Sequence, residues 1–144
     1  ANEWFFLNLY LTYSYIFDND YIGAIDRLLV VESQLERKGF DKVTLLQVKS
    51  QTSWHKMICY AHNQMEEDAY ESLSNIIKNN KKRAKLLNDD NVFREIKSNE
   101  QFQTAWVNIL FGKYDLARKN LKQFKVLSKY YNSIINKCTP YRFC

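Results

Sequence analysis

The chain reads Asp20-Tyr21-Ile22-Gly23-Ala24-Ile25 near its start, and related stretches return at Glu66-Glu67-Asp68-Ala69-Tyr70 and Lys113-Tyr114-Asp115-Leu116-Ala117. Each stretch begins with polar or turn-forming residues and then places an alanine early in a segment of helical apolar spacing. A small side chain at that point lets two antiparallel helices approach closely. The three stretches therefore predict three turns, each of which joins two antiparallel helices.

The composition favours a fold made of helices. Of 144 residues, 3 are Gly, 1 is Pro and 46% are hydrophobic. Sheet proteins of this size need many turn residues, so the scarcity of Gly and Pro indicates few, long helices with short connections. The chain length fits one domain of common size. We expect an all-α fold in one helical-repeat domain over residues 1–137, followed by a C-terminal tail over residues 138–144.

Apolar spacing and capping residues place the helices of the first half of the chain. A first helix is expected from Asn2 to Phe17. A second is expected from about Tyr21 to Gly39, since glycine suits the left-handed conformation that often ends a helix. Asp41 is placed to cap a third helix. A break near residues 63–64 then separates this helix from a fourth.

The second half of the chain has weaker signals. The basic stretch 78–83 is expected to be a solvated helix end or a loop. Two shorter helical pieces are expected over residues 92–96 and 99–111, with a capping box at Ser98 to Gln101 opening the second piece. A last helix is expected from Tyr114 to about Lys137. Its apolar face is predicted to hold Ala117, Leu121, Phe124, Leu127, Tyr131 and Ile134.

A tyrosine precedes the turn alanine by nine residues in the first two units, as Tyr15 before Ala24 and Tyr60 before Ala69, whereas the third unit has Asn108 there. This pairing and the turn at residues 113–117 resemble the tetratricopeptide repeat family. Residues 91–102 also resemble a stretch that often follows such repeats. The alanines lie 45 and 48 residues apart, against about 34 for a standard repeat. The resemblance is therefore to a diverged, irregular member of the family.

The resemblance implies a right-handed superhelix of stacked hairpins, whose first helices line a groove for a peptide or a helix. Carried over by register from the turn alanines, the groove positions are Phe6, Leu9, Tyr13, Trp54, Ile58, Phe102 and Trp106. The family's chaperone-tail binders use Lys and Asn at such positions to hold a carboxylate, and this sequence lacks them. The implied ligand is an apolar face, such as that of an amphipathic helix. The alternative is that these side chains belong to the core.

Charge is distributed unevenly along the chain. Residues 1–72 hold 6 basic and 11 acidic residues, residues 73–112 hold 7 and 4, and residues 113–144 hold 8 and 1, which gives net charges of −5, +3 and +7. Arg118, Lys122, Lys125 and Lys129 recur at intervals of four, three and four and so form one stripe. The stripe suits an acidic protein, nucleic acid or an anionic lipid surface. A solvated outer face is the alternative, and nucleic acid is disfavoured because no nucleic-acid motif accompanies the stripe.

Catalytic and metal chemistry find little support in the sequence. His55, Cys59 and His62 share one helical face, but the two histidines lie about 10.5 Å apart along the axis, too far for one ion at ~2 Å. A Cys59 nucleophile with a histidine base lacks an oxyanion-forming loop. Scattered glycines form no phosphate-binding loop. We expect a buried Cys59 between two half-exposed histidines, and no enzyme, metal or cofactor.

The remaining expectations concern location and partners. No secretory signal is apparent, and three sparse cysteines suit a reducing compartment. Cys138 and Cys144 either pair with each other or remain free in the tail. The apolar segment 4–17 would span about 21 Å as a helix, short of a ~30 Å bilayer core. We therefore expect a cytoplasmic interaction module or scaffold with a protein or peptide partner. Membrane attachment is expected only through a segment outside this chain, as in a soluble domain of a membrane-tethered protein.

Overall fold

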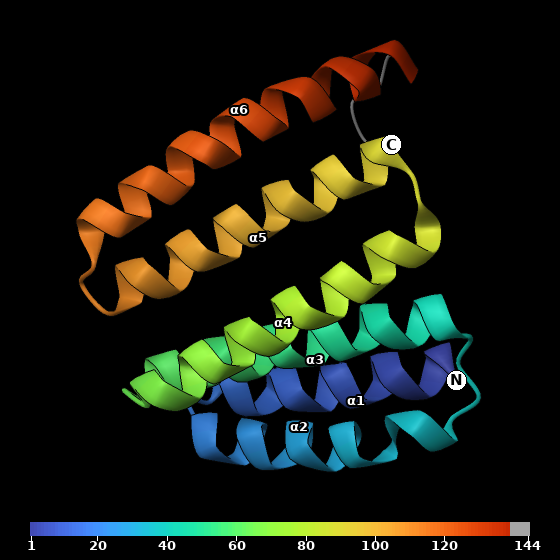
Figure 1. Cartoon of the computed structure of the whole chain (residues 1–144). Helices are drawn as coiled ribbons and strands as arrows, with labels where there is room; N and C mark the ends of the chain where they lie inside the picture. Colours follow the sequence, from blue (N-terminus) through green and yellow to red (C-terminus); the bar gives the residue numbers. More distant parts are fainter. Residues whose placement is uncertain (139–144) are drawn as a thin grey trace. The chain divides into compact units, whose positions relative to one another are not determined.

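The computed structural model describes the backbone of residues 1–138 and the side chains of residues 1–129. Within this range the chain is helical and contains no strand, which confirms the all-α prediction. The helices follow one another in pairs, each joined by a tight turn (Figure 1). The elements are α1 (Asn2–Phe17), α2 (Tyr21–Gln34), the 3-10 helix η1 (Leu35–Arg37), α3 (Lys42–His62), α4 (Glu66–Leu87), α5 (Asp90–Leu110) and α6 (Tyr114–Cys138).

The chain divides into two compact units, Ala1–Leu86 and Leu87–Cys144. The first unit contains the hairpins α1–α2 and α3–α4, and the second contains the hairpin α5–α6. The single domain expected over residues 1–137 stays a prediction. The expected tail, residues 138–144, lies outside the described residues except for Cys138, which ends α6.

The three hairpins close with the same backbone geometry. After the first helix of each pair, one residue adopts a positive φ, and it and the next residue donate N–H bonds back into the last helical turn. The bonds run from Asn19 to Ile16 and Asp20 to Tyr15, from Gln64 to Ala61 and Met65 to Tyr60, and from Gly112 to Ile109 and Lys113 to Asn108, with lengths between 2.8 and 3.1 Å. These are Schellman caps, in which the left-handed residue reverses the chain while the last helical carbonyls stay satisfied.

The turn alanines pack as the sequence predicts. Ala24, Ala69 and Ala117 are all buried. The N–H of each donates at 3.0 Å to the carbonyl of the residue that closes its cap. Tyr15 provides a carbonyl that accepts one cap hydrogen bond, and Ala24, nine residues later, is the buried alanine in the first turn of the next helix. Because the cap geometry sets this spacing, it also holds in the third unit, where Asn108 stands in place of tyrosine.

Clusters of buried side chains join the first three helices of the first unit. One contains Phe5, Leu9, Val31, Leu35 and Val48, from α1, α2, η1 and α3. Another contains Ala24, Ile25, Leu28 and Cys59, from α2 and α3. The helix α2 contributes to both clusters, so α1, α2 and α3 share a core. This core fixes which face of α1 turns outward.

The helix α5 differs from the sequence-based expectation. It runs without a break from Asp90 to Leu110, so the prediction of two shorter pieces with a capping box at Ser98 is wrong. Ser98 lies in mid-helix, and its hydroxyl is 2.9 Å from that of Ser128 on α6. The helix is capped by Asp89, whose carboxylate accepts from backbone N–H groups of the first turn.

The end of α2 differs from the expectation, whereas the basic stretch 78–83 follows one of its two expected forms, a helix end. The helix α2 ends at Gln34, and η1 and Gly39, with a φ of 78°, complete the passage to α3. The helix α4 continues through the basic stretch 78–83 to Leu87. It begins with three acidic residues and ends among basic ones, an order that the helix dipole favours at both ends.

Candidate functional site

One face of α1 carries aromatic side chains that the core does not cover. Phe6, Tyr10, Tyr13 and Phe17 follow one another at intervals of four, three and four, and we call them the α1 aromatic face. Phe6, Tyr10 and Phe17 expose 50%, 67% and 81% of their surface, and Tyr13 is half-buried. Leu9, assigned to the groove from the sequence, is instead 6% exposed and belongs to the core, so that assignment is wrong.

Tyr13 connects the α1 aromatic face to α3. Its hydroxyl lies 2.7 Å from Nε2 of His55, and the two ring centroids are 5.3 Å apart. Nδ1 of His55 lies 2.7 Å from the carbonyl oxygen of Gln51. A carbonyl oxygen only accepts, so Nδ1 carries the proton and Nε2 accepts from the tyrosine hydroxyl. Burial lowers the pKa of His55 and raises the pKa of Tyr13, so both groups are neutral at neutral pH.

Trp54 and Ile58 lie one turn apart on α3, and both are half-buried. Ile58 follows His55 by three residues, so it lies on the side of α3 that Tyr13 approaches. The structure thus places Phe6, Tyr13, Trp54 and Ile58 on two neighbouring helices, α1 and α3, which are the first helices of their hairpins (Figure 1). Each of the four keeps some exposed surface.

Phe102 and Trp106 belong to the second unit, on α5. Their rings meet edge to face, with centroids 5.7 Å apart, and they expose 37% and 40% of their surface. Phe102 also lies against Phe124 of α6, at 5.5 Å between centroids. These two predicted residues therefore combine a packing role in the hairpin with an exposed edge.

The hairpin α5–α6 is held partly by amides. Asn108 is buried and its side-chain amide donates to Asn120 at 3.0 Å, while the amide of Asn120 donates to Gln101 at 3.0 Å. Asn108 stands where the first two units have tyrosine, and in the third unit this position makes a polar contact across the hairpin.

The four residues of the predicted anion-docking stripe, Arg118, Lys122, Lys125 and Lys129, are all exposed on α6. Arg118 pairs with Asp115 at 2.7 Å. Leu121, predicted on the apolar face, is 39% exposed, so its side chain reaches the surface beside the stripe. Tyr131 and Ile134, predicted on the same face, lie outside the described side chains.

His55, Cys59 and His62 each have a separate structural role. Cys59 is buried and free, and burial raises its thiol pKa to about 11. The ring of His62 stacks on Tyr21, with centroids 5.0 Å apart and planes inclined by 8°. Among the residues that the structure describes, no group of three or more His, Cys, Asp or Glu side chains is arranged to hold a metal ion.

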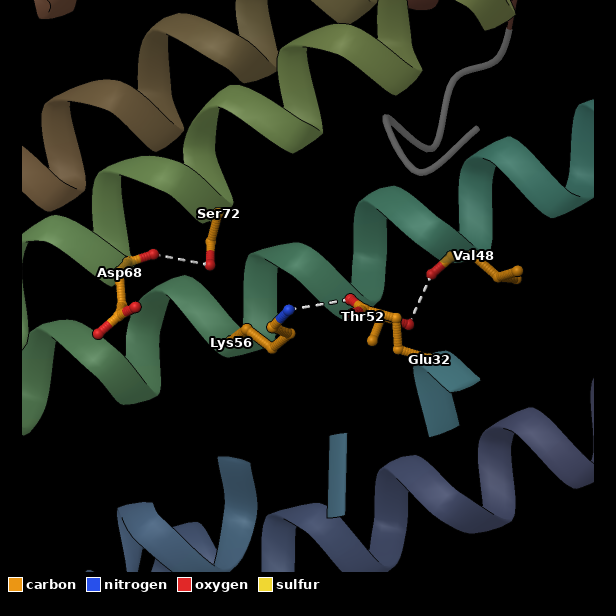
Figure 2. Close-up of polar contacts among 6 residues, drawn as sticks. All are labelled: Glu32, Val48, Thr52, Lys56, Asp68 and Ser72. Carbon is orange, nitrogen blue, oxygen red and sulfur yellow. Dashed lines mark hydrogen bonds and ion pairs between the residues drawn. The ribbon is translucent and has the colours of Figure 1, made fainter. Parts of the chain in front are cut away.

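An ion pair between α2 and α3, buried on the lysine side only, was not predicted from the sequence. Nζ of Lys56 lies 2.9 Å from Glu32, and the lysine side chain is 9% exposed against 42% for the glutamate (Figure 2). Thr52, one turn before Lys56 on α3, donates its hydroxyl to the Val48 carbonyl at 2.8 Å, and Figure 2 draws this bond. The Thr52 bond satisfies a buried hydroxyl within α3. In the sequence, the buried position of Lys56 is marked only by the polar residues that surround it on α3.

Polar contacts within single helices also occur on α4. The hydroxyl of Ser72 donates to the Asp68 carbonyl at 3.0 Å, so this buried serine is satisfied within its own helix (Figure 2). Between helices, Arg27 of α2 donates to the side-chain oxygen of the buried Asn8 on α1. The contact between Arg27 and Asn8 joins α2 to the helix that carries the α1 aromatic face.

Comparisons of the chain with protein-family models, with curated proteins and with solved structures found no match. Over the described part of the chain, no helix combines the length and the apolar character that crossing a membrane requires. Function is therefore inferred from the two surfaces described above, the α1 aromatic face with its neighbours on α3 and the basic stripe of α6.

Proposed function

We propose that this chain is a non-enzymatic interaction module that holds an amphipathic helix or a peptide against α1 and α3. The observation that carries the proposal is the exposure of the α1 aromatic face, where Phe6, Tyr10 and Phe17 leave half or more of their surface uncovered. Monomeric soluble proteins rarely leave large contiguous apolar patches exposed. Aromatic side chains are also the groups that most often anchor protein interfaces.

The dimensions of this face suit a helical partner. From Phe6 to Phe17 the face runs about 16 Å along α1, the length of three helical turns. A partner helix of that length presents apolar side chains at positions i, i+3, i+4 and i+7. Trp54 and Ile58 on α3 extend the apolar surface to one side of it. The predicted contact residues include no lysine or asparagine to grip a terminal carboxylate, so an apolar helix face is the better ligand.

A tetratricopeptide-like arrangement is part of this proposal. It is supported by three hairpins that close with one cap geometry and by buried alanines at equivalent positions. It is also supported within the first unit by the contact of Tyr13 with His55, which sets the first helices of two hairpins beside each other. A right-handed superhelix and a cytoplasmic scaffolding role complete the proposal.

A displayed library of helical peptides, selected against the whole chain, tests the proposal. Enriched peptides should carry apolar residues at helical spacing, and calorimetry should give their affinity. In the double variant Phe6→Ser and Tyr10→Ser, affinity should fall at least about ten-fold, because two exposed anchors are lost. The matched control is Leu29→Ser with Val30→Ser, which changes two exposed side chains on α2.

Circular dichroism and urea denaturation must show that each variant is folded. Equal losses in the α1 and α2 variants, or a selection that enriches no helical peptide, would contradict the proposal. Trp54→Ala gives an independent check on α3. A folded variant with weaker binding assigns Trp54 to the contact surface, whereas an unfolded variant assigns it to the core.

A further inference from the structure

We propose that α6 docks the protein on an anionic lipid bilayer through its basic stripe, Arg118, Lys122, Lys125 and Lys129. The proposal goes beyond helix binding, because it concerns another helix and another class of partner. It is independent of whether the α1 aromatic face binds a peptide.

The stripe lies on a part of α6 that α5 leaves uncovered. The side of α6 that meets α5 is marked by contacts of Asn120, Phe124 and Ser128 with Gln101, Phe102 and Ser98. The four residues of the stripe are exposed instead. From Arg118 to Lys129 they extend about 16 Å along the helix, so a flat surface can meet all four at once.

The charge of the stripe is not balanced from within the helix. The acid of the first turn, Asp115, pairs with Arg118. Lys122, Lys125 and Lys129 have no acidic residue three or four positions away, and each has another lysine at that distance. Like charges at this spacing destabilise a helix. An anionic surface would remove that cost, so the pattern is complementary to such a surface.

The net charge of the chain is also concentrated here. Residues 87–144 hold 10 basic and 5 acidic residues, whereas residues 1–86 hold 11 of each. The second unit therefore carries the whole net charge of +5. Attraction to the negative surface potential of a bilayer acts over about a Debye length, so it acts mainly on the face that carries the cations.

Apolar side chains on both edges of the stripe favour a bilayer over nucleic acid. Leu121 is three residues from Arg118 and four from Lys125, and it is 39% exposed. Val126 is four residues from Lys122 and three from Lys129, and it is 66% exposed. A phosphate backbone offers little to an aliphatic side chain, whereas a lipid interface takes up aliphatic side chains and lysines together. Lysine stems can lie along the interface with the ammonium groups at the headgroups.

Sedimentation of the whole chain with vesicles tests the inference. The chain should bind phosphatidylcholine vesicles containing about one-third phosphatidylserine, should not bind pure phosphatidylcholine, and should be released by high salt. Lys122→Gln with Lys125→Gln should weaken binding about 25-fold, at about five-fold for each lysine. The matched control is Lys81→Gln with Lys82→Gln, which removes two exposed cations from α4 and should change binding less than two-fold.

A second variant separates lipid from other anions. Val126→Ser should weaken vesicle binding several-fold, because an apolar contact with the interface is lost, and should leave any binding to duplex DNA unchanged. The inference is overturned if the anionic vesicles are not bound, or if the α4 control loses as much affinity as the α6 variant. Tighter binding to a DNA duplex than to the vesicles would likewise overturn it and assign the stripe to nucleic acid. None of these results depends on the peptide selection that tests the proposed function.

Discussion

The hydroxyl of Tyr13 lies 2.7 Å from Nε2 of His55, and this contact joins the first helices of two successive hairpins. It belongs to a chain of three groups, because Nδ1 of the same imidazole donates to the Gln51 carbonyl. In this arrangement the imidazole is neutral and Nε2 accepts from the tyrosine. Protonated Nε2 could only donate, so protonation reverses this hydrogen bond and places a charge in a buried position. The position of the α1 aromatic face beside α3 is therefore linked to the protonation of one histidine.

This linkage predicts a loss of stability as pH falls. Burial lowers the pKa of His55 below its usual 6.5, so the unfolded chain binds the proton more readily than the folded one. The contribution of neutral His55 is therefore fully present above pH 6.5 and is lost as pH falls below it and through the folded pKa. Urea denaturation of the wild type at pH 8, 6.5 and 5.5 should show a falling free energy of unfolding.

The variant His55→Gln is the control for this pH dependence. Glutamine can still accept a hydrogen bond from Tyr13 but does not titrate, so the variant should lose less stability than the wild type between pH 8 and 5.5. An identical pH dependence in the two proteins would show that other groups are responsible.

The thiol of Cys59 is predicted to be unreactive in the folded protein. Burial raises its pKa from the usual 9.0 to about 11, which lowers the thiolate fraction about 100-fold at pH 8. In a variant with Cys138 and Cys144 changed to Ser, Cys59 is the only thiol. Labelling of this variant with iodoacetamide should be at least about 100-fold slower in buffer than in urea. Comparable rates under the two conditions would mean that Cys59 is accessible in the native state.

The parts of the fold that could be predicted from the sequence are those set by local chemistry. The break after α1, the cap at Asp41 and the positions of Ala24, Ala69 and Ala117 depend on residues within one or two turns of each other. The capping box at Ser98 has the same kind of local signal, but there the outcome depends on a distant contact. Ser98 faces Ser128 of α6, so its hydroxyl has a partner across the hairpin and α5 continues through it.

The candidate site could be predicted only in part for a related reason. The register from the turn alanines placed Phe6, Leu9 and Tyr13 in one groove. Phe6 and Tyr13 lie on the α1 aromatic face, whereas Leu9 is in the core. Apolar residues occur on all sides of α1, so polarity does not mark its outer face. The exposure of Tyr10 and Phe17 is decided by how α2 and α3 pack against α1, which no local pattern records.

The ion pair of Lys56 and Glu32 should respond unequally to loss of its two partners. Glu32→Gln leaves the buried ammonium of Lys56 without a counter-charge and should lower the free energy of unfolding by about 1–2 kcal/mol. This loss is smaller than for a fully buried pair, because Glu32 is 42% exposed and solvent screens its charge. Lys56→Met keeps the packing of the stem and should change stability by less than about 1 kcal/mol. Chemical denaturation measures both. A larger loss for Lys56→Met than for Glu32→Gln would contradict this account.

Gly23 lies close to the side chains of Asp20 and Tyr15 at the first turn, so whether Gly23→Ala raises or lowers the stability of the protein tests this packing. Replacing glycine by alanine inside a helix normally stabilises by up to about 1 kcal/mol. At Gly23, however, an added Cβ would lie 2.5 Å from Oδ2 of Asp20 and 2.8 Å from Cδ1 of Tyr15. The carboxylate of Asp20 caps α2 by accepting from the Gly23 N–H at 2.9 Å, so moving it costs a cap as well. Gly23→Ala should therefore destabilise the protein by about 1–3 kcal/mol.

A double-mutant cycle with Tyr15→Ala measures how much of this loss comes from the tyrosine ring. In the Tyr15→Ala background, Gly23→Ala should cost less stability than in the wild type, because the ring no longer opposes the methyl group. If Gly23→Ala stabilises the chain instead, Tyr15 does not pack across the first hairpin as the structure has it.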